Sequence, residues 1–287
     1  MNILIVKLSA IGDVIHTLPA LAALRRCYPD ADITWVVEEA AADLLTGHPD
    51  LDRVLVSRRK TWMRDFRQGR IAAPLREMRA LIRELRSRPY DLVIDFHGLF
   101  KSAVLVLLSG GKRKLGYDSM QEGSGLFYNE KIPEAMEKHA VDRYLDFVRY
   151  LEGNGISTPC LADAPEFTIT VGGRRLRHRT ALQNELSEGF EAVESRGDGT
   201  ESGGKRKAER RFVALSPVAF WETKLWEDNK FAELGDRIRQ ELGIGVILTG
   251  GEADRLDKIK ARMKTAAVNF GGQTTLRELA SLYRDAS

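Results

Sequence analysis

The sequence predicts an α/β protein made of two doubly wound domains, each with a parallel sheet wrapped by helices. Short apolar segments rich in β-branched residues alternate with longer segments whose apolar residues recur at helical spacing. This alternation is typical of strand–helix–strand units in a parallel sheet. A stretch dominated by Gly, Ser, Glu, Lys and Arg separates two such series, and its composition is that of a linker. We therefore expect two domains that face each other across a cleft.

The expected elements follow the chain in a regular order. In the first domain, residues 1–171, the predicted strands are 2–6, 33–37, 53–56, 91–96 and 113–117, and the predicted helices are 13–26, 39–46, 74–87, 100–108 and 138–151. The polar linker occupies 172–211. In the second domain, residues 212–287, the strands lie in RFVALS, GVILTGG and AVNFGG, and the helices are 228–241, 252–264 and 274–283.

Composition excludes several classes of protein. The chain has 287 residues, 43% of them hydrophobic, which is enough to fill two domain cores. Its longest apolar run, AVLVLL at 103–108, is too short to span a bilayer, and Lys7 and Asp13 interrupt the N-terminal apolar stretch where a signal peptide would continue. We expect a cytoplasmic protein. Its two cysteines and five histidines show no ligand spacing, so no metal site is predicted.

Positive charge is concentrated in one segment. Between Arg53 and Arg88 there are twelve Arg or Lys residues and three acidic residues. Such an excess favours an anionic partner, whether phosphate, carboxylate, nucleic acid or the inner leaflet of a membrane. For 76–88 a solvated helix face beside an apolar stripe is an equal alternative. In SRRKTWMRDFRQ, residues 57–68, basic residues alternate with aromatic ones just beyond a strand, and we predict a binding loop there.

The segment KLSAIGDVIHTLPAL, residues 7–21, marks the corner between the first strand and the first helix. In a parallel sheet this corner lies at the carboxyl edge, where ligands bind. Gly12 would let the backbone approach a ligand closely, and Asp13 is either a general base facing the cleft or a residue that caps the helix. Because other strands end at the same edge, we expect one rim that is also lined by Ser9, Glu38, Glu39, Asp95, His97 and Lys101.

Rival motifs are weak. The sequence has no GxGxxG, P-loop or GxSxG pattern, so the usual signatures of dinucleotide enzymes, NTPases and serine hydrolases are missing. Two D-x-D triplets, at 30–32 and 50–52, resemble the metal-binding motif of some sugar transferases. Both precede strands, which places them at the edge opposite the proposed site. We interpret them as turn residues.

Two residues of the second domain are candidates for binding a nucleotide. Lys224 lies between tryptophans in SPVAFWETKLW, directly after a strand. A cation there would neutralise a diphosphate leaving group, although a surface lysine packed beside a core Trp226 is the alternative. Glu252 follows Gly250 and Gly251. It would accept a hydrogen bond from a nucleotide ring or ribose hydroxyl, or it is a first-turn Glu favoured by the helix dipole.

Several motifs together resemble a known family. KLSAIGDVIHTLPAL, WVVEEA, RRKTW, DFHGLFKSA, LFYN, HAVDRY and WETKLW followed by TGGE are similar to the ADP-heptose:lipopolysaccharide heptosyltransferases, glycosyltransferase family 9, and most of all to its heptosyltransferase I branch. The resemblance covers nearly the whole chain. It implies a GT-B fold, in which the first domain binds the acceptor and the second binds ADP-heptose.

The resemblance also implies the reaction. The family transfers L-glycero-D-manno-heptose from ADP-heptose to the first Kdo sugar of Kdo2-lipid A, with inversion and without a metal, at the cytoplasmic face of the inner membrane. ADP-heptose is then a co-substrate, no cofactor is needed, and no nucleic acid partner is expected. A related ADP-sugar transferase with another acceptor, and a non-catalytic fragment that only binds an anionic acceptor, are the alternatives.

Site residues carry over position by position. Asp13 matches the family's proposed catalytic base. The acceptor side is matched by Ser9, Gly12, Arg58, Arg59, Lys60 and Lys101, and the donor side by Lys224 and Glu252. After a helix like LRELASLYRDAS the family continues into a donor-binding loop and a C-terminal helix, which this sequence lacks. We therefore expect a truncated chain with an incomplete second domain.

Overall fold

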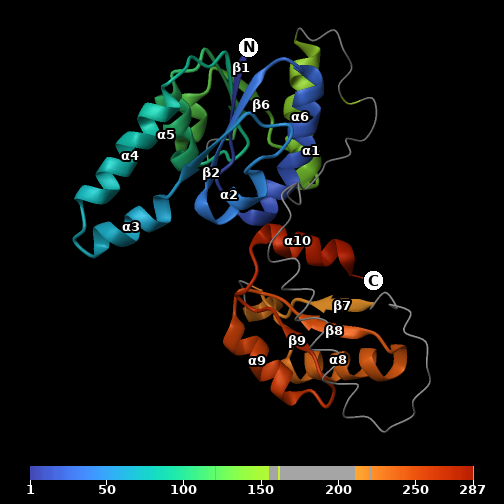
Figure 1. The fold of residues 1–287 in the computed structure, drawn as a ribbon. Helices are drawn as coiled ribbons and strands as arrows, with labels where there is room; N and C mark the ends of the chain where they lie inside the picture. The colour runs from blue at the N-terminus through green and yellow to red at the C-terminus, as the bar shows by residue number, and fades with distance from the viewer. Residues whose placement is uncertain (120, 155–160, 162–210, 220–221, 287) are drawn as a thin grey trace. The chain divides into compact units, whose positions relative to one another are not determined.

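The chain divides into two units, and each is described by itself. In the computed structural model unit one is Met1–Thr170 and unit two is Val171–Ser287 (Figure 1). The structure describes residues 1–119, 121–154, 161, 211–219 and 222–286. The predicted linker at 172–211 lies outside the described residues except for Arg211.

Unit one contains a six-stranded parallel sheet in the order β3-β2-β1-β4-β5-β6. This is the strand order of a doubly wound α/β fold, so the predicted fold class is confirmed. The five expected strands are present, and a sixth, β6, was not predicted because only three residues form it. The strands are β1 Asn2–Val6, β2 Asp32–Glu38, β3 Arg53–Ser57, β4 Leu92–Asp95, β5 Arg113–Tyr117 and β6 Glu130–Ile132.

Helices cover both faces of this sheet. The described helices of unit one are α1 Ile11–Cys27, α2 Glu39–Leu45, α3 Arg59–Arg67, α4 Ala72–Leu85, α5 Phe100–Ser109, the 3-10 segment η1 Gln121–Phe127 and α6 Ala140–Gly153. Side chains of β1 alternate between the two layers. Ile3 and Ile5 pack in the core with α1 and α6, which lie side by side in Figure 1. Leu4 and Val6 pack in the opposite core with α3, α4 and α5.

The loop conformation predicted for 57–68 is wrong, because Arg59–Arg67 forms the helix α3, whereas the binding role predicted for this segment stays a prediction. Trp62 and Phe66 are four residues apart and therefore lie on one side of a helix. Trp62 is only 6% exposed and packs in the same core as residues of α4, with Phe66 partly buried beside it. The next glycine, Gly69, has a positive φ of 74° and follows the end of the helix. The alternation of basic and aromatic residues in this segment therefore arises because the aromatic side of the helix faces the core and the basic residues lie outside it.

Unit two contains a parallel sheet of three described strands in the order β7-β8-β9. Its three strands and three α-helices are those that the sequence predicts. They are β7 Phe212–Leu215, η2 Glu222–Lys224, α8 Asp228–Leu242, β8 Gly245–Leu248, α9 Ala253–Arg262, β9 Val268–Asn269 and α10 Leu276–Asp285. Val246 and Leu248 of β8 pack in one core with α8 and α9, whereas Ile247 faces the other core with Leu282 of α10.

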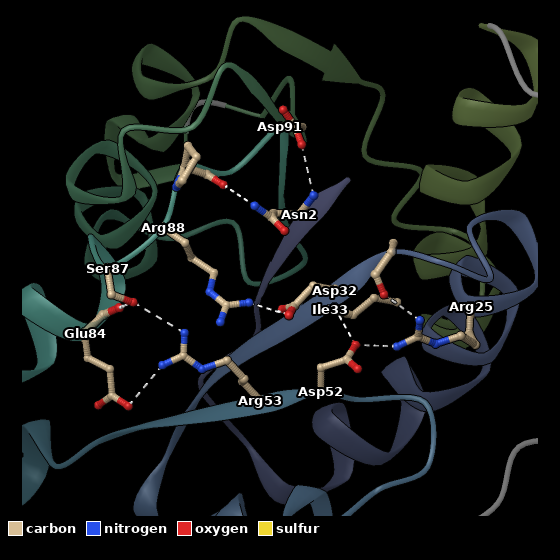
Figure 2. A network of polar contacts seen from close by, with 12 residues as sticks. Asn2, Arg25, Asp32, Ile33, Asp52, Arg53, Glu84, Ser87, Arg88 and Asp91 are labelled. Carbon is tan, nitrogen blue, oxygen red and sulfur yellow. Dashed lines mark hydrogen bonds and ion pairs between the residues drawn. The ribbon is translucent and has the colours of Figure 1, made fainter.

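The two D-x-D triplets lie at the amino ends of β2 and β3, as predicted. Figure 2 shows the last aspartate of each triplet, Asp32 and Asp52. Asp32 pairs with Arg88. Asp52 accepts a hydrogen bond of 2.7 Å from Arg25 and thereby ties α1 to the start of β3. The first aspartate of each triplet lies in a turn. These carboxylates hold the edge of the sheet that is opposite to the ligand-binding edge.

Candidate functional site

The loop between β1 and α1 is anchored by a buried lysine. Lys7 is 4% exposed, and its Nζ donates to the Phe96 carbonyl at 3.1 Å and to Tyr144 Oη at 2.7 Å. The next residue, Leu8, accepts a backbone hydrogen bond from Glu38 at 2.9 Å. These bonds fix the loop to the ends of β2 and β4 and to α6, so the start of α1 has a defined position at the carboxyl edge of the sheet.

Asp13 lies in the first turn of α1 and is partly buried. Its Oδ2 accepts a hydrogen bond of 3.2 Å from the Ala10 amide, which is the capping contact expected of an acidic residue at this position. Among the residues that the structure describes, Oδ1 of Asp13 accepts no hydrogen bond. One oxygen thus holds the helix start, and the other is available to accept a proton.

The loop after β4 is organised by Asp95. This carboxylate is completely buried and accepts hydrogen bonds from the amides of His97 and Gly98, at 2.8 and 3.2 Å, and from Tyr128 Oη at 2.7 Å. Burial raises its pKa, although these hydrogen bonds oppose the shift. Asp95 was predicted to line the rim. The structure instead gives it a positioning role beneath the rim.

His97 is a neutral imidazole at physiological pH. Burial lowers its pKa to about 3, and the nearby cations Lys7 and Lys101 add to this effect. Lys101, at the start of α5, approaches Ser9 with Nζ and Oγ 3.4 Å apart. Burial also lowers the pKa of Lys101, against the attraction of Glu38. The structure therefore brings Ser9 and Lys101 together, as the shared sheet edge predicts.

Gly12 is exposed in the first turn of α1. A Cβ built on it would meet no atom within 4 Å. Packing inside the protein therefore does not require glycine at this position. Its predicted role in a close approach to a ligand stays a prediction.

The predicted acceptor cluster, Arg58 with Arg59 and Lys60, is engaged in ion pairs with the acidic residues that end β2. Arg59 donates to Glu38 Oε1 at 3.1 and 3.2 Å, and Lys60 Nζ lies 3.3 Å from Glu38 Oε2. Arg58 pairs with Glu39 at 3.2 Å and with Glu77 of α4 at 3.3 Å. An acceptor anion bound here would share these three cations with carboxylates of the protein, which lowers its net electrostatic gain.

An open groove of about 480 Å³ continues from this cluster along α3. Sequence reasoning counted its further cations only as part of a charge excess. The helical spacing of Lys60, Arg64 and Arg67 is the signal that would have placed them on one face. The groove is lined by Arg59, Lys60, Met63, Arg64, Arg67 and Gln68.

In unit two the predicted donor-binding residues follow the carboxyl ends of β7 and β8. Lys224 is exposed in η2, and Glu252 is the exposed N-cap residue of α9, without a side-chain capping bond. Trp226 is 46% exposed, so the core position that the alternative reading gave to this tryptophan is wrong, whereas the donor-binding role of Lys224 stays a prediction. Thr249, at the end of β8, is buried, and its Oγ1 lies 3.0 Å from Tyr283 Oη.

Among the residues that the structure describes, neither a metal site nor a membrane span is found. No group of three or more His, Cys, Asp or Glu side chains that could hold a metal ion occurs in this part of the chain. No described helix is both long enough and apolar enough to cross a membrane.

The family model of glycosyltransferase family 9 (heptosyltransferase) matches residues 78–287. The chain belongs to this family. Its resemblance to glycosyltransferase family 9, expected from the motifs, is thereby confirmed.

Relatives agree with this assignment. Lipopolysaccharide heptosyltransferase 1 of Escherichia coli K12 is 40% identical over 147 residues, which is 50% of this chain and 45% of that protein. Its counterpart in Pseudomonas aeruginosa is 29% identical over 274 residues, 93% of this chain and 67% of that protein. The first of these matches thus spans less than half of the relative's length.

Solved structures of the family share the fold. The E. coli heptosyltransferase WaaC with ADP has a TM-score of 0.74 and 26% identity, and the match covers 100% of this chain and 79% of that chain. The same enzyme with ADP-2-deoxy-2-fluoro heptose gives a TM-score of 0.73 and 25% identity, with 100% and 81% coverage. The GT-B architecture of these enzymes is therefore the fold of this family member.

Proposed function

We propose that this protein is a lipopolysaccharide heptosyltransferase of inner-core synthesis, with ADP-L-glycero-D-manno-heptose as donor and the Kdo of Kdo2-lipid A as acceptor. Family membership supports a heptosyl transfer, and the relative solved with ADP-2-deoxy-2-fluoro heptose supports an ADP-sugar donor. The observation that carries the mechanism is the carboxylate of Asp13, held at the first turn of α1 by one oxygen with the other unbonded among the described residues.

In the proposed reaction Asp13 accepts the proton of a Kdo hydroxyl. That oxygen attacks the anomeric carbon of the heptose, and the bond from this carbon to the diphosphate oxygen breaks. ADP leaves from the opposite face, so the anomeric configuration inverts. Lys224 neutralises the charge that develops on the diphosphate, and Glu252 accepts a hydrogen bond from the nucleoside. The proposal requires no metal and no cofactor.

On the acceptor side we assign two groups of residues. Ser9, Gly12 and Lys101 border the reacting hydroxyl, and the cluster Arg58–Lys60 binds carboxylate and phosphate groups of the acceptor. Because the acceptor is a membrane lipid, the protein works as a peripheral protein at the cytoplasmic face of the inner membrane. The ion pairs of the cluster with Glu38, Glu39 and Glu77 keep it preformed before acceptor arrives.

The test is release of ADP from ADP-heptose in the presence of a soluble Kdo-bearing lipid A analogue. We expect Asp13→Asn to lower kcat by at least about a hundredfold, because asparagine retains an oxygen for the Ala10 amide but is not a base. The acceptor dissociation constant should stay the same. Asp30→Asn, in a turn at the opposite edge, is the matched control and should leave turnover unchanged. Unchanged turnover in Asp13→Asn would remove Asp13 from the mechanism.

Calorimetric titration of the wild-type chain with each substrate separates the alternatives. Binding of both ADP-heptose and the acceptor analogue is expected. Binding of acceptor alone would favour a non-catalytic acceptor-binding module. Binding of another ADP-sugar in preference to ADP-heptose would favour a related transferase.

A further inference from the structure

The helices α3 and α4, with the turn that joins them, form a helical hairpin at the outer edge of unit one (Figure 1). The inner side of this hairpin is well packed: Trp62 of α3 lies in one core with Leu81 and Leu85 of α4. Trp62 also donates a hydrogen bond of 2.8 Å to Glu77. The hairpin is therefore a packed part of the domain, and its backbone has a defined position.

Large apolar side chains lie on the outside of the hairpin. Met63 is 47% exposed, Ile71 57% and Leu75 39%. Ile71 is in the turn, and the other two are in the helical turns next to it. The core cluster that contains Trp62 includes none of these three side chains.

Arginines lie close to two of these apolar residues: Arg64 and Arg67 line the same groove as Met63, and Arg76 follows Leu75 in the sequence. Arg64, Arg67 and Arg76 are exposed, and no ion pair or hydrogen bond of their side chains is found within the described part of the chain. The nearby acidic residues are engaged elsewhere, Asp65 with Arg70 at the turn and Glu77 with Arg58 and Trp62. The outer face therefore carries uncompensated positive charge, in contrast to the cluster Arg58–Lys60.

This combination favours one kind of partner. Helices that lie in the membrane interface present apolar side chains to the acyl boundary and basic side chains to anionic headgroups, and arginine reaches the headgroups while its methylene groups cover apolar surface. A single-stranded nucleic acid would instead need exposed aromatic rings on which bases stack. The tryptophan of this hairpin faces inward, and the exposed apolar residues are aliphatic.

We propose that the outer hairpin face, formed by Met63, Arg64, Arg67, Ile71, Leu75 and Arg76, docks on an anionic phospholipid bilayer. Met63, Ile71 and Leu75 enter the headgroup region, and the three arginines contact lipid phosphates. The proposal names the surface for the peripheral membrane contact in the proposed function. Vesicle binding tests this surface and ADP release tests the proposed function, so either proposal can fail while the other stands.

The experiment is flotation of the full chain with lipid vesicles that contain no lipopolysaccharide, so that binding reports the bilayer and not the acceptor. One set of vesicles is phosphatidylcholine alone, and the other contains phosphatidylglycerol. We expect binding to the anionic vesicles, little binding to the neutral ones, and a decrease in binding as salt is raised.

Two double variants separate the apolar and ionic contributions. Met63→Ser with Ile71→Ser, and Arg64→Gln with Arg67→Gln, should each weaken binding to anionic vesicles by at least about tenfold. All four positions are exposed, so the fold should survive, which circular dichroism checks. Matched controls come from unit two: Leu242→Ser, where the leucine is 64% exposed, and the double variant Lys258→Gln with Lys260→Gln on the exposed side of α9. Both should bind as the wild type does.

Several results would overturn the proposal. These are absence of vesicle binding by the wild type, equal binding by the wild type and both hairpin variants, and an equal loss in the controls. Binding of inorganic phosphate or a DNA oligonucleotide that depends on Arg64 and Arg67, without vesicle binding, would also reject the bilayer as the partner.

Discussion

Lys7 offers a quantitative test of how the site loop is held. Burial lowers the pKa of its ammonium group from 10.5 to about 8, and the carboxylates Asp13 and Asp95 only partly oppose this effect. Arg143 and Lys101 also lower it. We predict that Lys7→Met changes how the free energy of unfolding depends on pH, and that the change is confined to alkaline pH.

The sign follows from proton binding in the two states. Below pH 8 both the folded and the unfolded chain hold the Lys7 proton, and the cost of burying the charge is fully present. Between pH 8 and 10.5 the unfolded chain keeps the proton while the folded chain releases it, so the free energy of unfolding rises with pH. The slope approaches about 1.4 kcal/mol per pH unit between the two pKa values, so the rise from pH 8 to about pH 10 is roughly 2 kcal/mol. Methionine cannot titrate, so its variant lacks this rise.

The assay is urea unfolding at about pH 7 and about pH 10. Tryptophan fluorescence reports it, since Trp35 Nε1 donates a hydrogen bond of 3.1 Å to the Lys7 carbonyl. The variant leaves the Phe96 carbonyl and the Tyr144 hydroxyl without this donor. That penalty is a constant offset and does not alter the pH dependence. Lys112→Met, at an exposed position, is the control and should run parallel to the wild type. Parallel curves for Lys7→Met and the wild type would refute the reasoning.

Three further outcomes test other parts of the structure. Burial raises the pKa of Asp52, but hydrogen bonds from the Ile33 amide and the Arg25 guanidinium outweigh this effect and hold the pKa below 3.8. Asp52→Asn should therefore lower the melting temperature near neutral pH. The difference in melting temperature from the wild type should shrink below about pH 4, where Asp52 becomes protonated. In Gly116→Ala the new Cβ would lie 2.3 Å from the Tyr128 ring, which is held at Asp95, so urea unfolding should show a loss of about 1–3 kcal/mol. Asp236→Ala removes the carboxylate that accepts hydrogen bonds from the amides of Lys264 and Thr265 and from the Thr265 hydroxyl. It should destabilise unit two by about 2 kcal/mol, as measured by hydrogen exchange. An unchanged exchange rate in α8 would contradict this.

Strong periodicity made most of the fold predictable. The strands of unit one are continuous apolar segments because helices cover both of their faces, and the helices between them have an apolar side. The order of elements then limits the topology to few arrangements. The strand β6 was missed because it is short. It has three residues, of which one is buried, so the sequence shows no alternation of apolar and polar residues there.

The sequence was sufficient to predict at which edge of the sheet the candidate site lies, but not which side chains contact one another there. That Ser9, Asp13 and Lys101 lie at the carboxyl ends of strands follows from the parallel sheet. Lys7 was passed over as a site residue, although it adjoins the loop, because nothing local distinguishes a buried lysine from a solvated one. Its partners, Phe96 and Tyr144, are 89 and 137 residues away along the chain.

The basic segment shows why a charge count and a binding surface are different quantities. A count treats the twelve cations between Arg53 and Arg88 as equal. The fold divides them. Glu38 and Glu39 lie beside Arg58, Arg59 and Lys60, whereas Arg64, Arg67 and Arg76 have no ion pair among the described residues, since Asp65 pairs with Arg70. The paired cations are held in place and suit a specific anionic ligand, for which preorganisation matters more than net charge. The unpaired arginines keep their long-range attraction, which suits a fluid anionic surface that offers many weak sites. Salt should therefore weaken vesicle binding more steeply than it weakens acceptor binding.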